Sequence, residues 1–511
     1  MNWHERSMNF PSNRRAPCIF FLVASLCQLP LAAADPPSLA GTWYGELNLV
    51  VQKLRLGFKI KSTPGGMLEG VMDSIDQSAF GIPLSAVQRE KEQVRIEIES
   101  LGVVFQATLS EDGQELGGTF KQNGIPLPLK LHRVDRYPTI QRPQEPQPPF
   151  PYDEQEVTYR NEIHDVKLTG TLSLPRSERA VAAVLLITGS GSQDRDESIA
   201  GHRPFMVIAD ALARRGVAVL RVDDRGVGGS TRGTSPATTL DLAEDVLAGV
   251  RFLAGHAKID VRRIGLAGHS EGGLIAPLAA MRTDDVAFIV MLAGPGLPGS
   301  RILERQARLI GEATKRPEWF LDWNHKVQLE MFKIIGDHQD PAESRKQLDA
   351  RMESWMAMIP EEQAFTSSTL RTQLEGQLDS VTSPWFRYFL FHDPAPVLRQ
   401  VPCPVLAMFG SKDLQVPAED NQLAVLEALE NGNNRFSTAR TFDGLNHLFQ
   451  ACQTGSPVEY GSIEETFNEQ ALEYMVGWIV RHTQTDPVRL SQRRRLRRWQ
   501  SRAANRESTV E

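Results

Sequence analysis

Cysteine is scarce in this chain, with four residues among 511. So low a content excludes a fold held together by a dense disulfide framework. Cys18 and Cys27 lie near the N-terminus, whereas Cys403 opens a strand-like run and Cys452 comes after the last such run. Six strand residues span roughly 20 Å, and a disulfide requires Cα atoms about 4.4 to 6.8 Å apart. The sequence therefore predicts that Cys403 and Cys452 are free thiols.

An excess of positive charge is also missing from most of the chain. The net charge is −7, and residues 484–511 alone carry eight Arg against three acidic residues, so the remainder sums to −12. An acidic body has no electrostatic footprint for DNA or RNA, and we expect no nucleic-acid partner. The Arg-rich tail holds too few apolar residues to form a core, which predicts disorder over 484–511.

Long hydrophobic runs are absent except near the N-terminus. Arg14 and Arg15 precede an apolar run at 18–29, and small residues follow at 32–34. This order is typical of a secretory signal, so we predict a signal peptide over 1–34 and an exported protein, periplasmic or secreted. The alternative is an uncleaved anchor, although about a dozen apolar residues fall short of the ~20 that cross a bilayer. We expect no membrane span in the mature chain.

Alternation of apolar and polar residues marks the segment that follows. Residues 53–61 alternate strictly, which predicts strands, and the segment 35–135 is interpreted as an antiparallel β domain. A weak internal repeat, 81–84 against 124–127, suggests two similar halves that close into a small barrel or a sandwich. Six prolines then punctuate 136–153, which predicts an extended linker.

From residue 154 to 483 the pattern changes to apolar runs separated by amphipathic segments. Runs at 184–187 and 264–267 are continuous, and the apolar residues between such runs recur at helical spacing. Continuous apolar strands that alternate with helices predict a mostly parallel sheet covered on both faces, which is an α/β fold.

The alternation stops between about residues 297 and 400, where helix formers and aromatic residues accumulate. A helical cap over the active edge of the sheet would bury these aromatic side chains. The alternative is a helical subdomain whose aromatic residues pack only against one another. The candidates for a substrate pocket are the aromatic residues just before the chain returns to the sheet, namely Trp385, Phe386, Tyr388 and Phe389.

One short motif carries chemistry. Gly268-His269-Ser270-Glu271-Gly272 lies between an apolar strand and a helical stretch. In this context a sharp turn holds the serine out from the sheet, and glycines on both sides remove side chains that would collide across it. Ser270 is therefore the predicted nucleophile.

A serine hydroxyl needs a base that accepts its proton, and the base needs an anionic partner. Asp413 follows the buried run 405–409, and His447 follows the last predicted strand, so both belong to the same sheet edge as Ser270. Asp443 and Asp420 are the alternative acids: the first lies close to His447 along the chain, and the second falls in a helix. We predict Asp413 as the acid and His447 as the base.

Acyl transfer also requires two N–H donors for the oxyanion. The main chain of Glu271 offers one, and Ser190, in the loop after the first core strand, offers the other, with Gly191 as the alternative. We expect His269 to point away beside the nucleophile, whereas His202 could line the site. The polar residues of the neighbouring loops are expected to brace them, namely Gln193, Asp194, Arg195, Asp196, Asp224 and Arg225.

Together these stretches resemble the α/β-hydrolase superfamily. More closely, they are similar to exported bacterial carboxylesterases of the EstD type, which carry a β domain ahead of the hydrolase domain. The similarity rests on Ile187-Thr188-Gly189-Ser190-Gly191, on Gln193 to Asp196, on Arg225-Gly226 with Gly228 and Ser230, and on the segments around Ser270 and His447. Thr188 stands where many members of the superfamily have His.

The resemblance implies a serine hydrolase that cleaves carboxylic esters through an acyl-enzyme, and we expect short to medium acyl chains. No metal or other cofactor is expected, and the expected partner is a small-molecule ester. Two alternatives stay open: a serine aminopeptidase with the same triad, and a non-catalytic binding protein on a hydrolase scaffold. The oligomeric state is not predicted.

Overall fold

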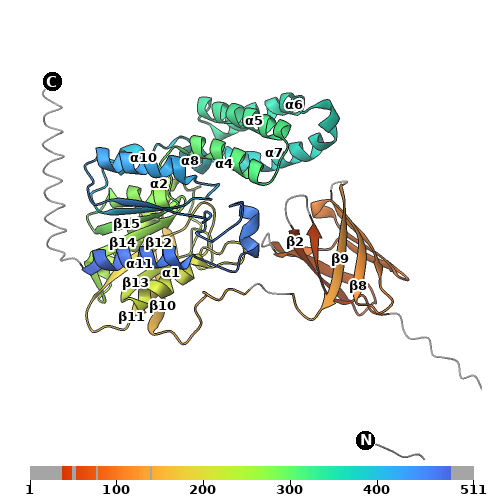
Figure 1. Cartoon of the computed structure of the whole chain (residues 1–511), viewed down its shortest axis with the longest axis horizontal. Coiled ribbons are helices and arrows are strands. Elements are labelled where there is room, and N and C mark those ends of the chain that lie inside the picture. Colours follow the sequence, from red (N-terminus) through yellow and green to blue (C-terminus); the bar gives the residue numbers. More distant parts are fainter. Residues whose placement is uncertain (1–36, 49–52, 76–78, 123–124, 138–140, 485–511) are drawn as a thin grey trace, which may run out of the picture.

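The computed structural model describes residues 37–48, 53–75, 79–122, 125–137 and 141–484. The predicted signal segment and the Arg-rich tail lie outside these ranges. Within them the chain forms two separate sheets, one antiparallel and one mostly parallel, and a layer of helices lies beyond the second sheet (Figure 1). The predicted order, a β domain ahead of an α/β domain, is confirmed.

The β domain is one antiparallel sheet with the strand order β4-β3-β2-β1-β9-β8-β7-β6-β5 in the described residues. The edge strands β4 and β5 are consecutive in sequence and β3 lies against β5, so the sheet curls into a barrel (Figure 1). The strands are β1 (Gly41–Asn48), β2 (Lys53–Ser62), β3 (Leu68–Ser74), β4 (Ala79–Pro83), β5 (Ala86–Glu90), β6 (Gln93–Ile98), β7 (Val103–Leu109), β8 (Glu115–Gln122) and β9 (Ile125–Val134).

The alternation of the sequence explains the interior of this barrel. In β7, Val103, Phe105, Ala107 and Leu109 are all buried, while the residues between them are more exposed. Successive side chains of a strand point to opposite faces, so every second residue reaches the core. Trp43 of β1 is fully buried in the same core.

The second sheet has the order β10-β11-β13-β12-β14-β15-β16-β17. Strands β10 and β11 pair in antiparallel fashion at one edge, and the strands from β13 to β17 are parallel. The strands are β10 (Tyr152–Asn161), β11 (Val166–Pro175), β12 (Val181–Ile187), β13 (Val217–Val222), β14 (Ile259–His269), β15 (Val286–Leu292), β16 (Val405–Gly410) and β17 (Thr438–Phe442).

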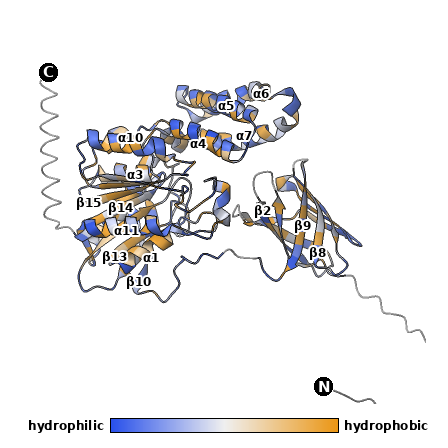
Figure 2. Ribbon diagram, in the orientation of Figure 1, coloured by the Kyte–Doolittle hydropathy of each residue, from blue (hydrophilic) through white to orange (hydrophobic). Residues whose placement is uncertain are grey.

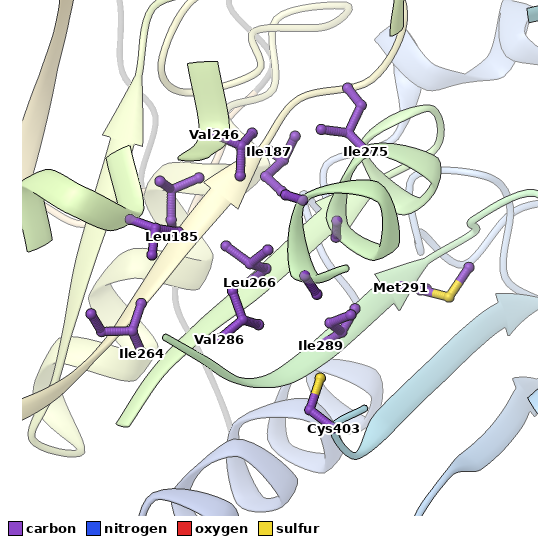
Figure 3. Packing of buried hydrophobic residues seen from close by; sticks show 14 of the residues in the cluster. Leu185, Ile187, Val246, Ile264, Leu266, Ile275, Val286, Ile289, Met291 and Cys403 are labelled. Atoms are coloured by element: carbon purple, nitrogen blue, oxygen red, sulfur yellow. The ribbon is translucent and has the colours of Figure 1, made fainter. Parts of the chain in front are cut away.

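Helices cover both faces of this sheet, so its central strands are apolar on both sides (Figure 2). On one face lie α1 (Pro204–Arg214) and α11 (Glu469–Gln484). On the other lie α2 (Thr239–Gly255), α3 (Gly272–Ala280) and α10 (Ala418–Asn431). Figure 3 shows the core between the sheet and the second group of helices. Here Leu185 and Leu266, on neighbouring strands, pack in one cluster with Val246 of α2 and Ile275 of α3. This packing fixes the strand ends that carry the site.

The predicted cap is a set of helices between β15 and β16. They are α4 (Gly299–Ala313), α5 (Glu318–Asp337), α6 (Pro341–Met356), α7 (Ser367–Val381), α8 (Pro384–Phe391) and the short α9 (Ala395–Leu398), with a 3₁₀ turn η3 (Glu361–Thr366). Helices α5, α6 and α7 share a core of their own in which Trp323 and Trp355 are buried, and the Trp323 Nε1 donates to the carbonyl of Trp355 at 2.8 Å. Part of the aromatic content therefore packs within the cap.

The proline-rich segment 141–151 lies against the α/β domain. The side chain of Gln144 accepts from the main-chain N–H groups of Thr466 and Phe467 at 2.6 and 3.0 Å. The carbonyl of Gly461, in the turn η4 (Pro457–Ser462), accepts from Arg142 of this segment at 3.1 Å and from Arg55 of the barrel at 2.9 Å. The β domain thus contacts the α/β domain at η4.

Neither Cys403 nor Cys452 forms a disulfide, as predicted. In the described ranges, no helix combines the length and the apolar character that crossing a membrane requires.

Candidate active site

The turn that carries Ser270 is a strained connection between β14 and α3. Ser270 has a φ of +52°, in the left-handed region that non-glycine residues seldom adopt, and its N–H donates to the carbonyl of Leu292 at 2.8 Å. A methyl group at Gly268 would lie 2.0 Å from the carbonyl oxygen of Gly272, and one at Gly272 would lie 2.3 Å from that of Ile187. The two flanking glycines are therefore required by close backbone contacts.

Asp413 and His447 meet at the carboxyl edge of the sheet. The His447 Nδ1 lies 2.8 Å from the Asp413 Oδ2, and both residues are buried. The Asp413 Oδ1 accepts from the N–H groups of Gln415 and Val416 at 2.8 and 2.9 Å. Because the carboxylate is held on both oxygens, it fixes the His447 ring with Nδ1 protonated and Nε2 free to accept a proton.

The alternative acids lie elsewhere. The Asp443 Oδ1 accepts from the hydroxyl of Ser411 at 3.0 Å, and Asp420 lies 3.4 Å from Arg305 of the cap. The structure therefore brings His447 together with Asp413 and with neither alternative.

Ser270 and His447 border one cavity of about 560 Å³ beneath the cap. Three of the four aromatic residues predicted for the pocket line it, namely Trp385, Phe386 and Phe389 of α8. Tyr388 does not: its ring stacks on His392 with centroids 4.9 Å apart. On a helix, residues three and four positions apart both lie near the first residue. Phe389, four positions after Trp385, lies on the same side, with ring centroids 5.8 Å apart. Tyr388, three positions after Trp385, does not.

The predicted oxyanion donors border Ser270 from two sides. Ser190 lines the cavity, and Glu271 is the N-cap of α3 directly after the nucleophile. Neither main-chain N–H donates to another described residue. The N–H of Gly189, by contrast, donates to the Glu197 Oε1 at 2.7 Å. Two donors are thus available for an oxyanion at this edge.

The side chain of Glu271 has a role that the sequence did not reveal. Its Oε1 accepts from the hydroxyl of Thr239 at 2.6 Å and from the Nε1 of Trp385 at 2.8 Å, and the residue is 1% exposed. One carboxylate oxygen thus links α2, the nucleophile turn and the cap helix α8. Trp385 lies 114 positions along the chain from Glu271, and no sequence motif joins the two.

The loops around the site are braced by buried carboxylates, as predicted. The two oxygens of Asp224 accept from the Thr188 hydroxyl at 2.8 Å and from the Gln193 N–H at 2.9 Å. Burial raises the pKa of Asp224 to about 7. Asp223 binds the guanidinium of Arg195 through both oxygens, at 3.0 and 2.7 Å.

Two histidine expectations need correction. His202 does not line the cavity: it is fully buried, and its ring nitrogens contact the hydroxyl of Thr466 and the carbonyl of Tyr460 at 3.1 and 2.8 Å. His269 does not simply point away, because it lines the cavity and its ring centroid lies 4.7 Å from that of His447. Both side chains instead bind segments that surround the site.

A second cavity, of about 690 Å³, adjoins the first. The two share Ser380 and Trp385, and the second is lined further by the loop residues Gly191, Ser192 and Arg232. Trp385 thus separates two compartments on either side of the oxyanion loop. Among the described residues, no group of three or more His, Cys, Asp or Glu side chains is placed to hold a metal ion.

The fold and the site define the class of the protein. Residues 132–454 match the model of the alpha/beta hydrolase family, and the chain belongs to that family. Esterase EstD of Thermotoga maritima is 24% identical over 332 residues, which make up 64% of this chain and 68% of the relative. Among solved structures, the Pyrococcus furiosus esterase Pf2001 is 17% identical with a TM-score of 0.40, covering 68% of this chain and 99% of that one. Est1E from Butyrivibrio proteoclasticus with ferulic acid bound is 16% identical with a TM-score of 0.34, covering 64% and 96%.

Proposed function

We propose that the protein is a carboxylic ester hydrolase that works through an acyl-enzyme. The observation that carries the proposal is the couple of His447 and Asp413, 2.8 Å apart. Its His447 borders the same cavity as Ser270, which lies on a strained turn. The esterase relative supports ester substrates. Ser270 is the nucleophile, His447 the base, Asp413 the acid that orients it, and the N–H groups of Ser190 and Glu271 form the oxyanion hole.

The first half of the reaction forms the acyl-enzyme. The Ser270 hydroxyl gives its proton to the Nε2 of His447 as the oxygen attacks the ester carbonyl, and Asp413 stabilises the resulting imidazolium. Negative charge develops on the carbonyl oxygen, where the N–H groups of Ser190 and Glu271 donate to it. When the intermediate collapses, the bond to the alcohol oxygen breaks, and His447 returns its proton to the departing alcohol.

The second half repeats the first with water as the nucleophile. His447 takes a proton from water, the hydroxide adds to the acyl carbonyl, and the bond to the Ser270 oxygen breaks as that oxygen regains a proton. The products are a carboxylic acid and an alcohol.

We propose that the cavity takes acyl groups of short to medium length. Trp385, Phe386 and Phe389 provide apolar surface beside Ser270, and each methylene buried there contributes about 0.8 kcal/mol until the space is filled. We expect kcat/KM to rise from acetyl to about butyryl or hexanoyl esters and then to fall. A series of p-nitrophenyl esters measures this directly, and a steady rise to palmitoyl esters would point to a lipase instead.

The peptidase alternative needs a carboxylate that is free to bind a substrate amine. Glu271 is the carboxylate next to the nucleophile. Its Oε1 accepts from Thr239 and Trp385 and its Oε2 has no partner among the described residues, but the residue is 1% exposed and does not line the cavity. This burial favours the ester hydrolase. Initial rates on p-nitrophenyl butyrate and on aminoacyl p-nitroanilides separate the two activities, and preference for the anilides would overturn the proposal.

A fluorophosphonate probe tests the covalent step. It should label the native chain at Ser270 and fail to label the Ser270→Ala variant. Absence of labelling in an active preparation would contradict the acyl-enzyme and would favour a binding protein if ester turnover were also absent.

Export is part of the proposal and rests on the sequence of residues 1–34 alone. The N-terminal sequence of protein recovered from a bacterial periplasm should begin near Asp35. Recovery of the full-length chain from the cytoplasm would contradict it.

A further inference from the structure

A second carboxylate–imidazole couple lies beside the first. The His269 Nδ1 is 2.9 Å from the Oε1 of Glu197, and its Nε2 is 3.0 Å from the main-chain carbonyl of His447. Both His269 and Glu197 are buried, at 5% and 1% exposure. The roles assigned to Ser270, Asp413 and His447 leave these two groups without a function.

The two hydrogen-bond partners of His269 determine how many protons the ring and Glu197 hold between them. A carbonyl oxygen only accepts, so the Nε2 must carry a hydrogen. The carboxylate of Glu197 also only accepts when it is ionised, so the Nδ1 must carry one too, unless the proton resides on Glu197 itself. In either arrangement the couple holds one proton more than a neutral imidazole beside an ionised carboxylate, and its net charge is zero.

Glu197 also holds the oxyanion loop. The same Oε1 accepts from the N–H of Gly189, which precedes the oxyanion donor Ser190. A side chain on Gly189 would approach the Cβ of Ser270 to 3.2 Å, so this loop packs directly on the nucleophile. Glu197 itself has a φ of +52°, a strained conformation that the surrounding contacts hold in place. The couple therefore connects Gly189 on one side of the cavity to the main chain of His447 on the other.

We propose that Glu197 and His269 are positioning residues that share one proton and hold the oxyanion loop and the His447 loop in register. This inference rests on the proposed function, because it assigns to the couple a role in the same reaction. Loss of the shared proton would leave two acceptors, the bare ring nitrogen and an oxygen, facing each other at about 3 Å. The loop of His447 or the loop of Gly189 would then move, and the rate would fall.

The charged groups around His269 are consistent with a retained proton. Burial on its own would lower the pKa of His269, but the charge and hydrogen bond of Glu197, the carbonyl of His447 and the charge of Asp413 raise it above the ordinary value. The ring of His447 is the other titratable group packed against His269. Because the couple is neutral as a whole, it opposes the imidazolium that forms on His447 only weakly.

The sign of the pH effect follows from this direction. The proton is present below the raised pKa of His269 and is lost as the pH rises through it, so the couple should contribute to the alkaline limb of the rate profile. Replacing Glu197 by Gln removes the negative charge that holds the proton. In addition, one amide oxygen beside a neutral ring cannot satisfy His269, Gly189 and the carbonyl of His447 together.

The test compares Glu197→Gln and His269→Gln with matched controls in p-nitrophenyl butyrate hydrolysis. We expect kcat to fall by roughly 10- to 100-fold in each, the range seen when an orienting outer partner is removed, with KM changed by less than about 3-fold. In Glu197→Gln the alkaline limb should move to lower pH by at least about one unit. The double variant should be no slower than about the worse single variant, because the two residues act as one unit.

The controls are Glu178→Gln, an exposed residue before β12 at the opposite end of the sheet from Ser270, and His132→Gln on the surface of the barrel. Both should keep the native rate and pH profile. An unchanged kcat and alkaline limb in Glu197→Gln, with a native melting temperature, would overturn the proposal.

A second measurement does not depend on turnover. In ¹⁵N-histidine NMR, the imidazole that disappears in His269→Gln should show no bare ring nitrogen at a pH at which an ordinary imidazole is neutral, because its Nδ1 either carries the shared proton or accepts it in a hydrogen bond from Glu197. A neutral His269 at that pH, with Glu197 ionised, would overturn the shared proton even in an active esterase. If the wild-type chain hydrolyses no ester and takes no fluorophosphonate, the proposed function fails, while the NMR result still decides whether the couple holds its proton.

Discussion

The carboxyl edge of the mostly parallel sheet and the core of the cap bury opposite kinds of side chain. At the sheet edge, Glu197, Glu271 and Asp413 are at most 3% exposed, and each carboxylate accepts from main-chain or side-chain donors. In the cap, the shared core of α5, α6 and α7 is apolar, and charged pairs such as Arg345 with Asp349 lie at its surface. Burial of a charge is costly unless the group is hydrogen-bonded or paired, and the Oε2 of Glu271 is buried there without a partner among the described residues. The polar edge is therefore where we place the chemistry.

The difference suggests a division of work. Substitutions at the sheet edge should change kcat, because they alter charge and orientation at the reacting atoms. Substitutions in the cap should change substrate preference or stability, because the cap contributes shape and apolar surface. Four variants test this division, from the largest expected effect on rate to the smallest.

Replacing Ser270 by Ala should have the largest effect. Removal of the nucleophile is expected to lower kcat by about 10⁴- to 10⁶-fold, since members of a triad act as a unit. The melting temperature should stay near that of the native chain, because a serine hydroxyl that borders a cavity contributes little packing. Stopped assays with p-nitrophenyl butyrate and a thermal melt measure both. Residual turnover near the native rate would place the nucleophile elsewhere.

Asp413→Asn should come next, with a fall in kcat of about 10⁴-fold. The amide still fills the space but no longer favours the His447 tautomer with Nδ1 protonated. Asp443→Asn is the matched control, because Asp443 contacts Ser411 rather than His447. A slow Asp443→Asn variant beside a fast Asp413→Asn variant would reverse the assignment of the acid.

Trp385→Phe lies at the border between the two regions. The ring is kept, but the N–H that donates to Glu271 is lost, and a hydrogen bond to a charged group is worth about 1.5 to 3 kcal/mol. We expect kcat/KM for butyryl esters to fall by about 10-fold, and Trp385→Ala should also flatten the dependence on acyl length. Tyr388→Phe serves as the control, since Tyr388 is on the same helix but does not line the cavity. Equal profiles for the two positions would contradict the pocket.

Trp355→Ala should have the smallest effect on rate and a large one on stability. Trp355 is fully buried in the cap core, and its Nε1 donates to Glu330 at 2.6 Å. Loss of a buried Trp side chain costs about 3 to 5 kcal/mol, and we expect hydrogen exchange in α5 to α7 to accelerate. Below the melting transition, kcat for acetyl esters should stay within about 3-fold. A rate loss as large as that of Asp413→Asn would show that the cap takes part in the chemistry.

Much of this arrangement could be predicted because strand ends of a parallel sheet share an edge. That rule placed Ser270, Asp413 and His447 together although the first and the last are 177 positions apart. The contacts of Glu271 with Trp385 and of His269 with Glu197 could not be predicted in the same way. These contacts depend on how a loop and a cap helix pack on the sheet, and the spacing of residues along the chain does not predict this packing.

The pocket residues show the same limit at a finer scale. The four residues of α8 that were predicted for the pocket were equivalent on the basis of composition, and three of them line the cavity. Tyr388 lies outside the cavity because of the rotation of the short helix α8 about its axis. That rotation depends on tertiary contacts, such as the stacking of the Tyr388 ring on His392. His202 was misplaced for a related reason, because the segment that buries it, Tyr460 to Thr466, comes from far along the chain.

Helix α3 is buried along its whole length, and its first turn begins beside the nucleophile. The aligned peptide dipoles of a helix place roughly half a positive charge at its N-terminus. Here that partial charge favours an oxyanion next to Ser270. Dissolved ions screen charges in contact with solvent far more than buried ones. The catalytic rate of this enzyme should therefore depend little on ionic strength, even in molar salt.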